Sequence, residues 1–283
     1  MAEALQLEFV RNALIAGVLV SIVCGVIGTL VVVNRIVFLA GGIAHAAYGG
    51  IGLAFFMGWP YAVGTTGVAL LSAGVMASVT LKARHRADAA VGVIWAVGMA
   101  AGVILLDLTP GYNVDLMSYL FGSILAVPAA DLWQMAVAGS LVLLVVGWYY
   151  NDFLAMSYDD EFARLRNVPV TFLHFLLLAM VALTVVMIIR VVGLILVIAL
   201  LTIPPFIAER FTGSLRAMMA LSALLSGLFT VTGLWLSYLL DLTSGATIIL
   251  VAAAGFFLAE LWQRLKPLPA KKDPSAGKVR PAA

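Results

Sequence analysis

A single histidine, His45, lies in an otherwise uncharged stretch. The stretch reads LAGGIAHAAYGGIG over residues 39–52. A neutral imidazole can serve as a ligand for zinc, iron or manganese. Because polar groups are costly in hydrocarbon, a histidine retained in an apolar run is a functional candidate by default. We therefore take His45 as the candidate metal ligand.

The glycines around His45 follow a helical spacing. On a helix, Gly41 and Gly49 lie one turn before and after the histidine, and Gly42 lies three residues before it. Small residues allow another backbone to approach closely in a membrane. Two interpretations stay open. Either this is a packing surface with one hydrogen-bonded histidine, or Gly41, Gly42 and Gly49 line a translocation pathway with space and bare carbonyls around one ligand. Cys24 and Met57 are possible soft neighbours, although plain packing is the favoured interpretation for both.

Other chemistry is absent from the sequence. It contains no phosphate-binding G-x-x-x-x-G-K-[ST], no H-E-x-x-H and no G-x-S-x-G motif. The chain is therefore not expected to be an enzyme or to hydrolyse ATP. The three histidines, at positions 45, 85 and 174, cannot build a multi-histidine metal cage within one chain. No permanently bound cofactor is expected.

Composition places the chain in a membrane. It is 64% hydrophobic and only 11% charged, with a mean hydropathy of +1.12, far outside the range of a soluble domain. The net charge of +2 is small and forms no basic stripe. Nucleic acid is therefore excluded as a partner, and the lipid bilayer is the expected environment.

Apolar runs long enough to span a bilayer can be found along most of the chain. Nine candidates fall near 13–33, 36–58, 61–81, 88–106, 132–150, 170–188, 191–208, 216–239 and 244–263. The seventh run is expected to break at Pro204 and Pro205. The segment 114–127 is apolar but short, which predicts a re-entrant helix. The fold class is thus an all-α polytopic bundle of eight or nine transmembrane helices in a domain of residues 1–263, followed by a disordered basic cytoplasmic tail, 264–283.

The positive-inside rule gives the orientation. With the N-terminus outside and the C-terminus cytoplasmic, all but Arg11 and Arg190 of the 16 lysines and arginines fall on the cytoplasmic side. The outer connections are then acidic, although single loop charges are most often merely solvated. These outer carboxylates are Asp107, Asp115, Asp131 and Asp241.

One cytoplasmic segment has the signals of a short surface helix. In SYDDEFARLRNVPV, residues 157–170, Ser157 and Asp160 fit a capping box, and Asn167 can take a left-handed C-terminal position. Phe162 and Leu165 form a small apolar face that has no core of its own. The helix either lies on lipid headgroups or docks into a groove of a partner.

The chain resembles the membrane permease subunits of the ATP-binding-cassette importers for zinc, manganese and iron over about residues 9–262. The resemblance rests on six blocks that occur in the family's order. They are GTLVVVNRIVFLAGGIAHA (28–46), DAAVGVIWAVGMAAGVILL (88–106), VDLMSYLFGSILAV (114–127), DDEFARLRNVPV (159–170), VVGLILVIALLTIPPFIAERFTGSL (191–215) and LDLTSGATIILV (240–251).

The resemblance implies a homodimer in the plasma membrane of a prokaryote, two cytoplasmic ATPase subunits and an extracytoplasmic metal-binding protein. It also identifies the segment from 157 to 167 as the coupling helix that contacts the ATPase. The residues expected in this coupling are Asp159, Asp160, Glu161, Phe162, Ala163 and Leu165.

The chain departs from the family at the metal site. The zinc and manganese permeases carry an aspartate four residues before the histidine, and Gly41 stands there in this sequence. A divalent metal importer subunit is the function that the resemblance implies. The Gly41 departure also leaves room for a chelated metal or another small solute. A self-sufficient secondary transporter or channel is the alternative from another class.

Overall fold

The computed structural model describes residues 8–82, 87–110, 122, 124 and 127–265, and this part of the chain forms helices and no strands. The helices are α1 (Glu8–Val33), α2 (Val37–Met57), α3 (Tyr61–Lys82), α4 (Ala87–Asp107), α6 (Ala129–Trp148), α7 (Tyr150–Tyr158), α8 (Asp160–Leu165), α9 (Val170–Val192), α10 (Leu194–Glu209), α11 (Leu215–Leu240) and α12 (Ser244–Leu265). The predicted all-α fold is confirmed.

Eight of these helices are long and apolar enough to cross a membrane, in agreement with eight of the predicted runs. The remaining run forms α10, which has only 16 residues. At 1.5 Å per residue it is about 24 Å long, shorter than the roughly 30 Å of hydrocarbon that a span must cross.

The expected break at Pro204 and Pro205 is wrong, since both prolines lie inside α10. Pro205 has no N–H to give to the carbonyl of Leu201. That carbonyl faces α1 at Gly28, where a Cβ atom would lie only 2.6 Å from it. The carbonyl that has lost its helical donor is therefore covered by the closely packed backbone of α1. The helix is interrupted instead at Gly193, which has a φ of 81° and a ψ of 164° and separates α9 from α10.

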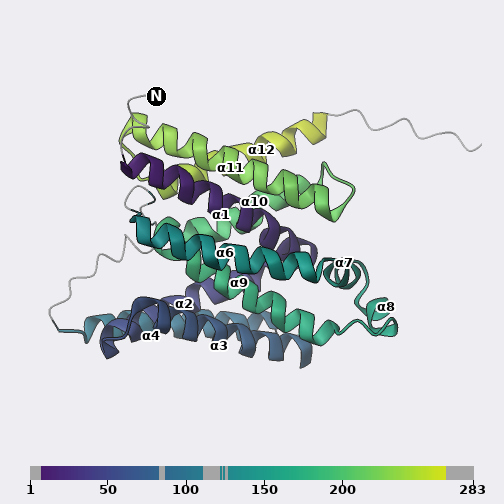
Figure 1. Ribbon diagram of the computed structural model, residues 1–283, viewed down its shortest axis with the longest axis horizontal. Coiled ribbons are helices and arrows are strands. Elements are labelled where there is room, and N and C mark those ends of the chain that lie inside the picture. The colour runs from purple at the N-terminus through teal and green to yellow at the C-terminus, as the bar shows by residue number, and fades with distance from the viewer. Residues whose placement is uncertain (1–7, 83–86, 111–121, 123, 125–126, 266–283) are drawn as a thin grey trace, which may run out of the picture.

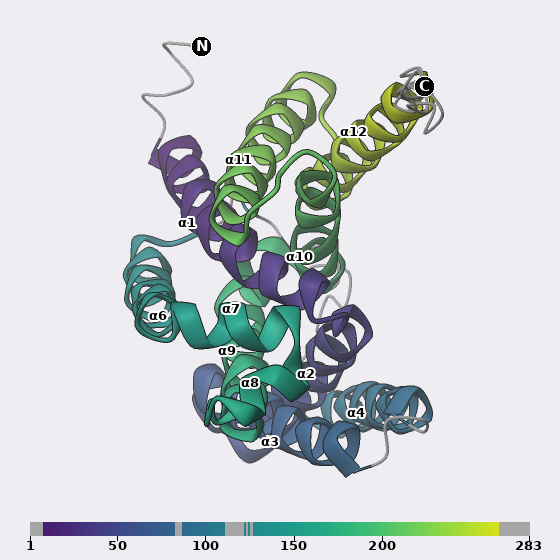
Figure 2. The ribbon, with the colours of Figure 1, turned by 90° about the vertical axis from the view of Figure 1, so that its right-hand side faces the viewer.

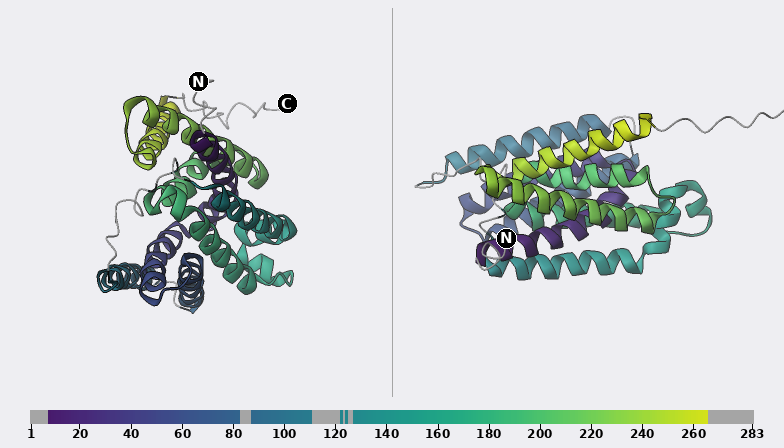
Figure 3. Two further views of the ribbon diagram at one scale, coloured as in Figure 1. Left: turned by 60° about the vertical axis from the view of Figure 1, so that its left-hand side comes forward. Right: turned by 90° about the horizontal axis from the view of Figure 1, so that it is seen from above.

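The long helices lie side by side, and the short helices α7 and α8 project at one end (Figures 1 and 3). Seen along the bundle, α1, α10, α11 and α12 form one group, and α2, α3 and α4 form another, with α6, α7 and α9 between them (Figure 2). The core runs through α1 and α9, and Val20, Ile27, Leu177 and Val181 are fully buried there.

The start of the surface helix differs from the prediction. Ser157 belongs to the preceding helix α7, so the Ser157–Asp160 capping box is wrong. The N-cap of α8 is Asp159, whose carboxylate accepts hydrogen bonds from the backbone N–H of Glu161 at 3.0 Å and of Phe162 at 2.9 Å. Asp159, which directly precedes the first turn of α8, thus has the capping role that was expected of Ser157.

The predicted end of the surface helix is confirmed. Asn167 has a φ of 61°, in the left-handed region. The N–H of Val168 donates to the carbonyl of Ala163, and that of Asn167 donates to the carbonyl of Arg164, each at 3.0 Å. These two bonds satisfy carbonyls that the helix end leaves without partners.

Some predictions fall outside the described residues. These are most of the 114–127 segment, His85, Asp115 and the tail beyond 265. Because α12 ends at Leu265, the first two residues of the predicted tail belong to the last helix.

Candidate metal site and coupling helix

His45 lies in the middle of α2, half-buried against α4. Its Nδ1 atom lies 3.0 Å from the Sδ atom of Met99. The indole of Trp95 stacks on the imidazole with ring centroids 3.9 Å apart and an angle of 12° between the planes. Trp95 and Met99 are four residues apart, so they lie on the same face of α4. One face of α4 thus supplies both neighbours of the histidine.

Phe38 extends this cluster towards the start of α2. Its ring centroid lies 6.1 Å from that of Trp95, and 43% of the residue is exposed. Other residues of the same helix pair, Val93 and Val97, are also exposed in the single chain. The cluster therefore lies beside an apolar surface of the single chain.

Glycines set the distance between α2 and its two neighbours. A Cβ atom at Gly49 would lie 2.7 Å from the carbonyl oxygen of Gly98, and one at Gly52 would lie 2.3 Å from that of Gly102. On another side of α2, a Cβ at Gly50 would lie 2.6 Å from the carbonyl oxygen of Gly64 in α3. Backbones in contact leave no room for any side chain, so glycine is required at these positions.

Gly42 and Gly41 have different surroundings. A Cβ at Gly42 would lie 2.5 Å from the side chain of Val91 and 2.8 Å from that of Met76. At Gly41, the nearest atoms are Cδ1 of Ile198 and Cζ3 of Trp95, both at an ordinary 3.9 Å. Gly42 and Gly49 thus lie in helix contacts within the chain, and Gly41 is the glycine with space beside it. Their role in a translocation pathway stays a prediction.

Cys24 and Met57, which the sequence offered as possible soft neighbours of His45, lie away from it. Cys24 is fully buried in α1. Met57 lies twelve residues beyond His45 in the same helix, which corresponds to about 18 Å along its axis. The sulphur atom beside the imidazole belongs to Met99 instead. His174, at the start of α9, forms a 2.8 Å hydrogen bond with the hydroxyl of Thr80 in α3.

One of the predicted outer carboxylates is not a solvated loop charge. Asp131 lies in the first turn of α6 and is buried. It lines a cavity of about 330 Å³ together with Tyr61, Gln134 and Met187, which come from α3, α6 and α9. Asp241, in contrast, is exposed and ends α11 with a φ of 52°, as expected of a helix terminator.

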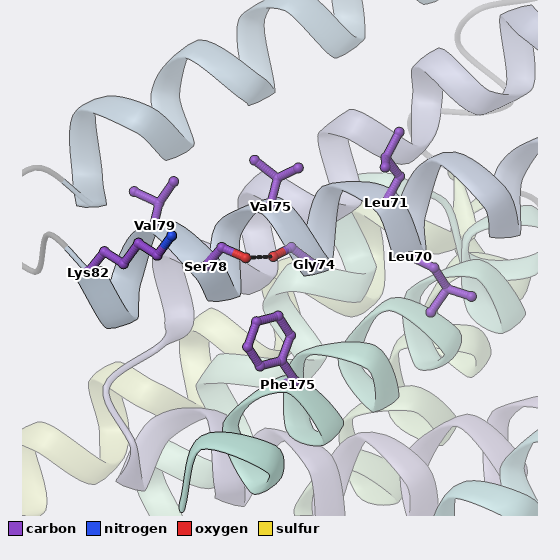
Figure 4. A pocket seen from close by; sticks show the side chains of 8 residues that line it. All are labelled: Leu70, Leu71, Gly74, Val75, Ser78, Val79, Lys82 and Phe175. Carbon is purple, nitrogen blue, oxygen red and sulfur yellow. Dashed lines mark hydrogen bonds between the residues drawn. The ribbon is translucent and has the colours of Figure 1, made fainter.

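A larger groove of about 670 Å³ runs along the outer face of α3 (Figure 4). Leu70, Val75 and Phe175 make its walls apolar, and the hydroxyl of Ser78 donates back to the carbonyl of Gly74 at 2.8 Å. Among the described residues that line it, Lys82 is the one that is charged. These described residues include no His, Cys, Asp or Glu, so they do not make the groove a candidate cation site.

The six predicted coupling residues lie together in and just before α8. Phe162 is 55% exposed and Leu165 is 82% exposed, while Ala163 is fully buried against the rest of the chain. Asp159 caps the helix, and Asp160 and Glu161 occupy its first turn, where carboxylates favour the N-terminus. The predicted apolar face thus projects from the described part of the chain, with the guanidinium of Arg166 lying 5.9 Å from the centroid of the Phe162 ring. Ala163 is the residue that anchors the helix.

A polar contact connects this region to the corner between α1 and α2. The amide nitrogen of Asn34 donates to the hydroxyl of Ser157 at 2.9 Å and to the carbonyl of Leu30 at 2.8 Å. Ser157 lies in α7, directly before α8, and Asn34 lies three residues before α2 begins. This pairing spans 123 residues of sequence.

Sequence reasoning missed Trp95, Met99, Asn34 and the partners of the α2 glycines. Only one signal was available for the first two residues: in WAVGM, residues 95–99, a tryptophan and a methionine share a helix face. Gly98 and Gly102 also repeat the four-residue spacing of small residues found in α2. No pattern in the sequence indicates that these two faces meet.

The eight long apolar helices, with a capped surface helix at one end, define a multi-pass membrane protein whose fold is that of a transport permease. Within that class, the chain belongs to the ABC 3 transport family, whose model matches residues 6–263. The resemblance drawn from the six sequence blocks is thereby confirmed. Several curated relatives carry the names of manganese or metal transport membrane proteins.

Two curated relatives and one solved structure show the extent of the similarity. An uncharacterised membrane protein of Synechocystis sp. is 47% identical over 93% of this chain and 94% of its own length. The manganese transport system membrane protein MntC of Halalkalibacterium halodurans is 32% identical over 91% of this chain and 88% of its own. PsaBC from Streptococcus pneumoniae, solved in complex with Fab, matches with a TM-score of 0.83 and 30% identity, covering 91% of this chain and 93% of that one.

Proposed function

We propose that the chain is the membrane subunit of an ATP-binding-cassette importer that moves a divalent metal ion, namely zinc, manganese or iron, into a prokaryotic cell. It acts as a homodimer in the plasma membrane, with separate cytoplasmic ATPase subunits and an extracytoplasmic metal-binding protein. The names of the relatives support this, since several are manganese or metal transport proteins.

The observation that carries the proposal is the surface of α8. A six-residue helix that is capped at both ends holds Phe162 and Leu165 out of the chain. Exposed apolar side chains on a rigid support are suited to a groove of a partner protein. The ATPase is the partner that the family requires.

The helix ends support the proposed orientation, with the N-terminus outside. Figure 1 shows α8 and the C-terminal end of α12 at the same end of the bundle. Arg164 belongs to α8 and Arg264 to the last turn of α12, while Arg210 lies in the connection between α10 and α11 and Arg216 in the first turn of α11. By the positive-inside rule, these arginines support the proposal that this end is cytoplasmic.

His45 is the proposed metal ligand. Within the described residues, no group of three or more His, Cys, Asp or Glu side chains could hold a metal. A site with few ligands suits transport, because the ion must also leave. A second copy of the chain would bring a second His45.

The test is ATP-driven uptake of radioactive zinc, manganese and iron by proteoliposomes that contain the chain with its ATPase. Phe162→Asp combined with Leu165→Asp should abolish copurification of the ATPase and lower uptake at least about tenfold, since charges replace the apolar contact. Leu242→Asp is the control, because Leu242 is comparably exposed, at 52%, in the connection at the far end of α11.

Two results would contradict the proposal. Uptake that persists without any ATPase would identify a secondary transporter. If His45→Ala moved each metal at the normal rate, the role assigned to His45 would be wrong.

A further inference from the structure

The imidazole of His45 faces a sulphur atom, and the two atoms come from different helices. Nδ1 of His45 in α2 and Sδ of Met99 in α4 are 3.0 Å apart. In one neutral tautomer Nδ1–H donates to the thioether. In the other, the proton is on Nε2 and two lone pairs point at the same small region. A cation between nitrogen and sulphur would stabilise that second arrangement.

In the described part of the chain, the side chains recorded against His45 are the thioether of Met99 and the indole of Trp95, and neither is a carboxylate. Trp95 covers one face of the imidazole, and Trp95 and Ile198 lie beside the position where a side chain of Gly41 would begin. An aspartate there would have to extend its carboxylate past the Cβ position into the space between these two side chains. The aspartate that the resemblance leads one to expect is thus absent, and an aromatic ring and a thioether stand beside the histidine instead.

The backbone holds this pair in register. Gly98, next to Met99 in the chain, contacts α2 at Gly49 and at Ala46, where its own Cβ would lie 2.7 Å from the Cα atom of Ala46. Both contacts are within about one turn of His45. Since backbone atoms cannot yield as a flexible side chain can, helix packing fixes the spacing between the backbones that carry the imidazole and the sulphur, and the two side chains meet across it.

We propose that Met99 is a metal ligand with His45 and that it determines which metal is preferred. Thioether and imidazole donors suit borderline or soft ions such as zinc, whereas manganese favours carboxylates and carbonyls. The site is therefore selective for zinc over manganese, with its remaining ligands drawn from water, carbonyl oxygens or the second copy. This inference rests on the proposed function, because it assigns selectivity to the same site.

The experiment measures metal binding separately from transport. The full-length chain in lipid nanodiscs is titrated with zinc and with manganese, and X-ray absorption at the zinc edge reports any sulphur in the first coordination shell. Met99→Leu keeps the side-chain volume and removes the sulphur. Met187→Leu, at a partly buried methionine of α9, is the matched control.

Met99→Leu should weaken zinc binding about tenfold, leave manganese binding nearly unchanged and remove the sulphur signal. Met99→Glu, which puts a carboxylate in place of the thioether, should move the preference towards manganese. A structural role of Met99 would change both metals equally and would give no sulphur signal in the unmodified chain.

Failure of the inference can be told apart from failure of the proposed function. An equal zinc-to-manganese ratio in Met99→Leu, the control and the unmodified chain would overturn the role of Met99, and ATP-driven uptake would still support the importer. Absence of zinc binding by the unmodified chain, with uptake intact, would also overturn the inference. Absence of ATP-driven uptake of every metal would overturn both, because the selectivity has no transport to act on.

Discussion

The two proposed functional regions of this molecule, α8 and the surroundings of His45, are held in place in opposite ways. The ends of α8 are determined within its own segment, by the carboxylate of Asp159 and the left-handed Asn167. The surroundings of His45 come from α4, in a contact between residues 54 positions apart. A surface helix with local caps can be recognised from sequence. A site made by two packed helices depends on how their faces meet.

The two regions also differ in what their packing tolerates. Phe162 and Leu165 project out of the chain, so substitutions there disturb only what binds them. Around His45 the backbones of α2 and α4 touch at Gly49 and Gly52. The same size of change is therefore expected to affect partner binding in the first region and folding in the second.

The largest effect is expected from Gly52→Ala. Its new methyl group would lie 2.3 Å from the carbonyl oxygen of Gly102, which belongs to a rigid helix. We expect this overpacking to cost about 2 kcal/mol of stability, seen as a lower melting temperature of the purified chain in detergent.

Gly41→Ala is the control, since its Cβ would have ordinary 3.9 Å contacts. It should be neutral or stabilising, because alanine favours a helix over glycine by up to about 1 kcal/mol. Equal melting temperatures for the two variants would show that the α2–α4 contact is not tight.

The same contrast explains what could be predicted from the sequence. Eight spans, the position of the surface helix and its end at Asn167 follow from run length and local signals. His45 could be identified from the sequence as a candidate ligand because a lone imidazole in an apolar run is conspicuous. Met99 and Trp95 could not, since methionine and tryptophan are ordinary residues of an apolar helix and only tertiary packing places them beside the histidine.

The errors have physical causes of the same kind. Pro204 and Pro205 indicated a helix break by local chemistry, but both lie inside α10, where Leu201 and Pro205 pack closely against Gly28 of α1. Ser157 had the right residue type for a cap, and a tertiary bond to Asn34 accompanies its different place, inside α7. Asp131 appeared to be a loop charge because the cavity that encloses it is formed by three separate helices.

An intermediate effect is expected from Asp159→Ala. It removes two hydrogen bonds at the start of α8, and loss of such a cap costs about 1 kcal/mol. The cost is confined to a six-residue helix, so the overall melting temperature should hardly change. The affinity for the ATPase should fall several-fold, measured by pull-down from detergent solution. Asp159→Asn retains a capping oxygen and should bind nearly as well; a loss as large as that of alanine would indicate that the charge contacts the ATPase directly.

The smallest effect is expected where the two regions are connected. Ser157→Ala removes the hydroxyl that accepts the hydrogen bond from Asn34, while the bond from Asn34 to the carbonyl of Leu30 remains. The loss should be below about 1 kcal/mol, too small to prevent folding or ATPase binding. Because the bond joins the helix before α8 to the corner that leads into α2, its loss should reduce the metal moved per ATP hydrolysed. Ser157→Thr keeps the hydroxyl and should restore this ratio. If the ratio were unchanged in Ser157→Ala, this hydrogen bond would have no part in coupling α8 to α2.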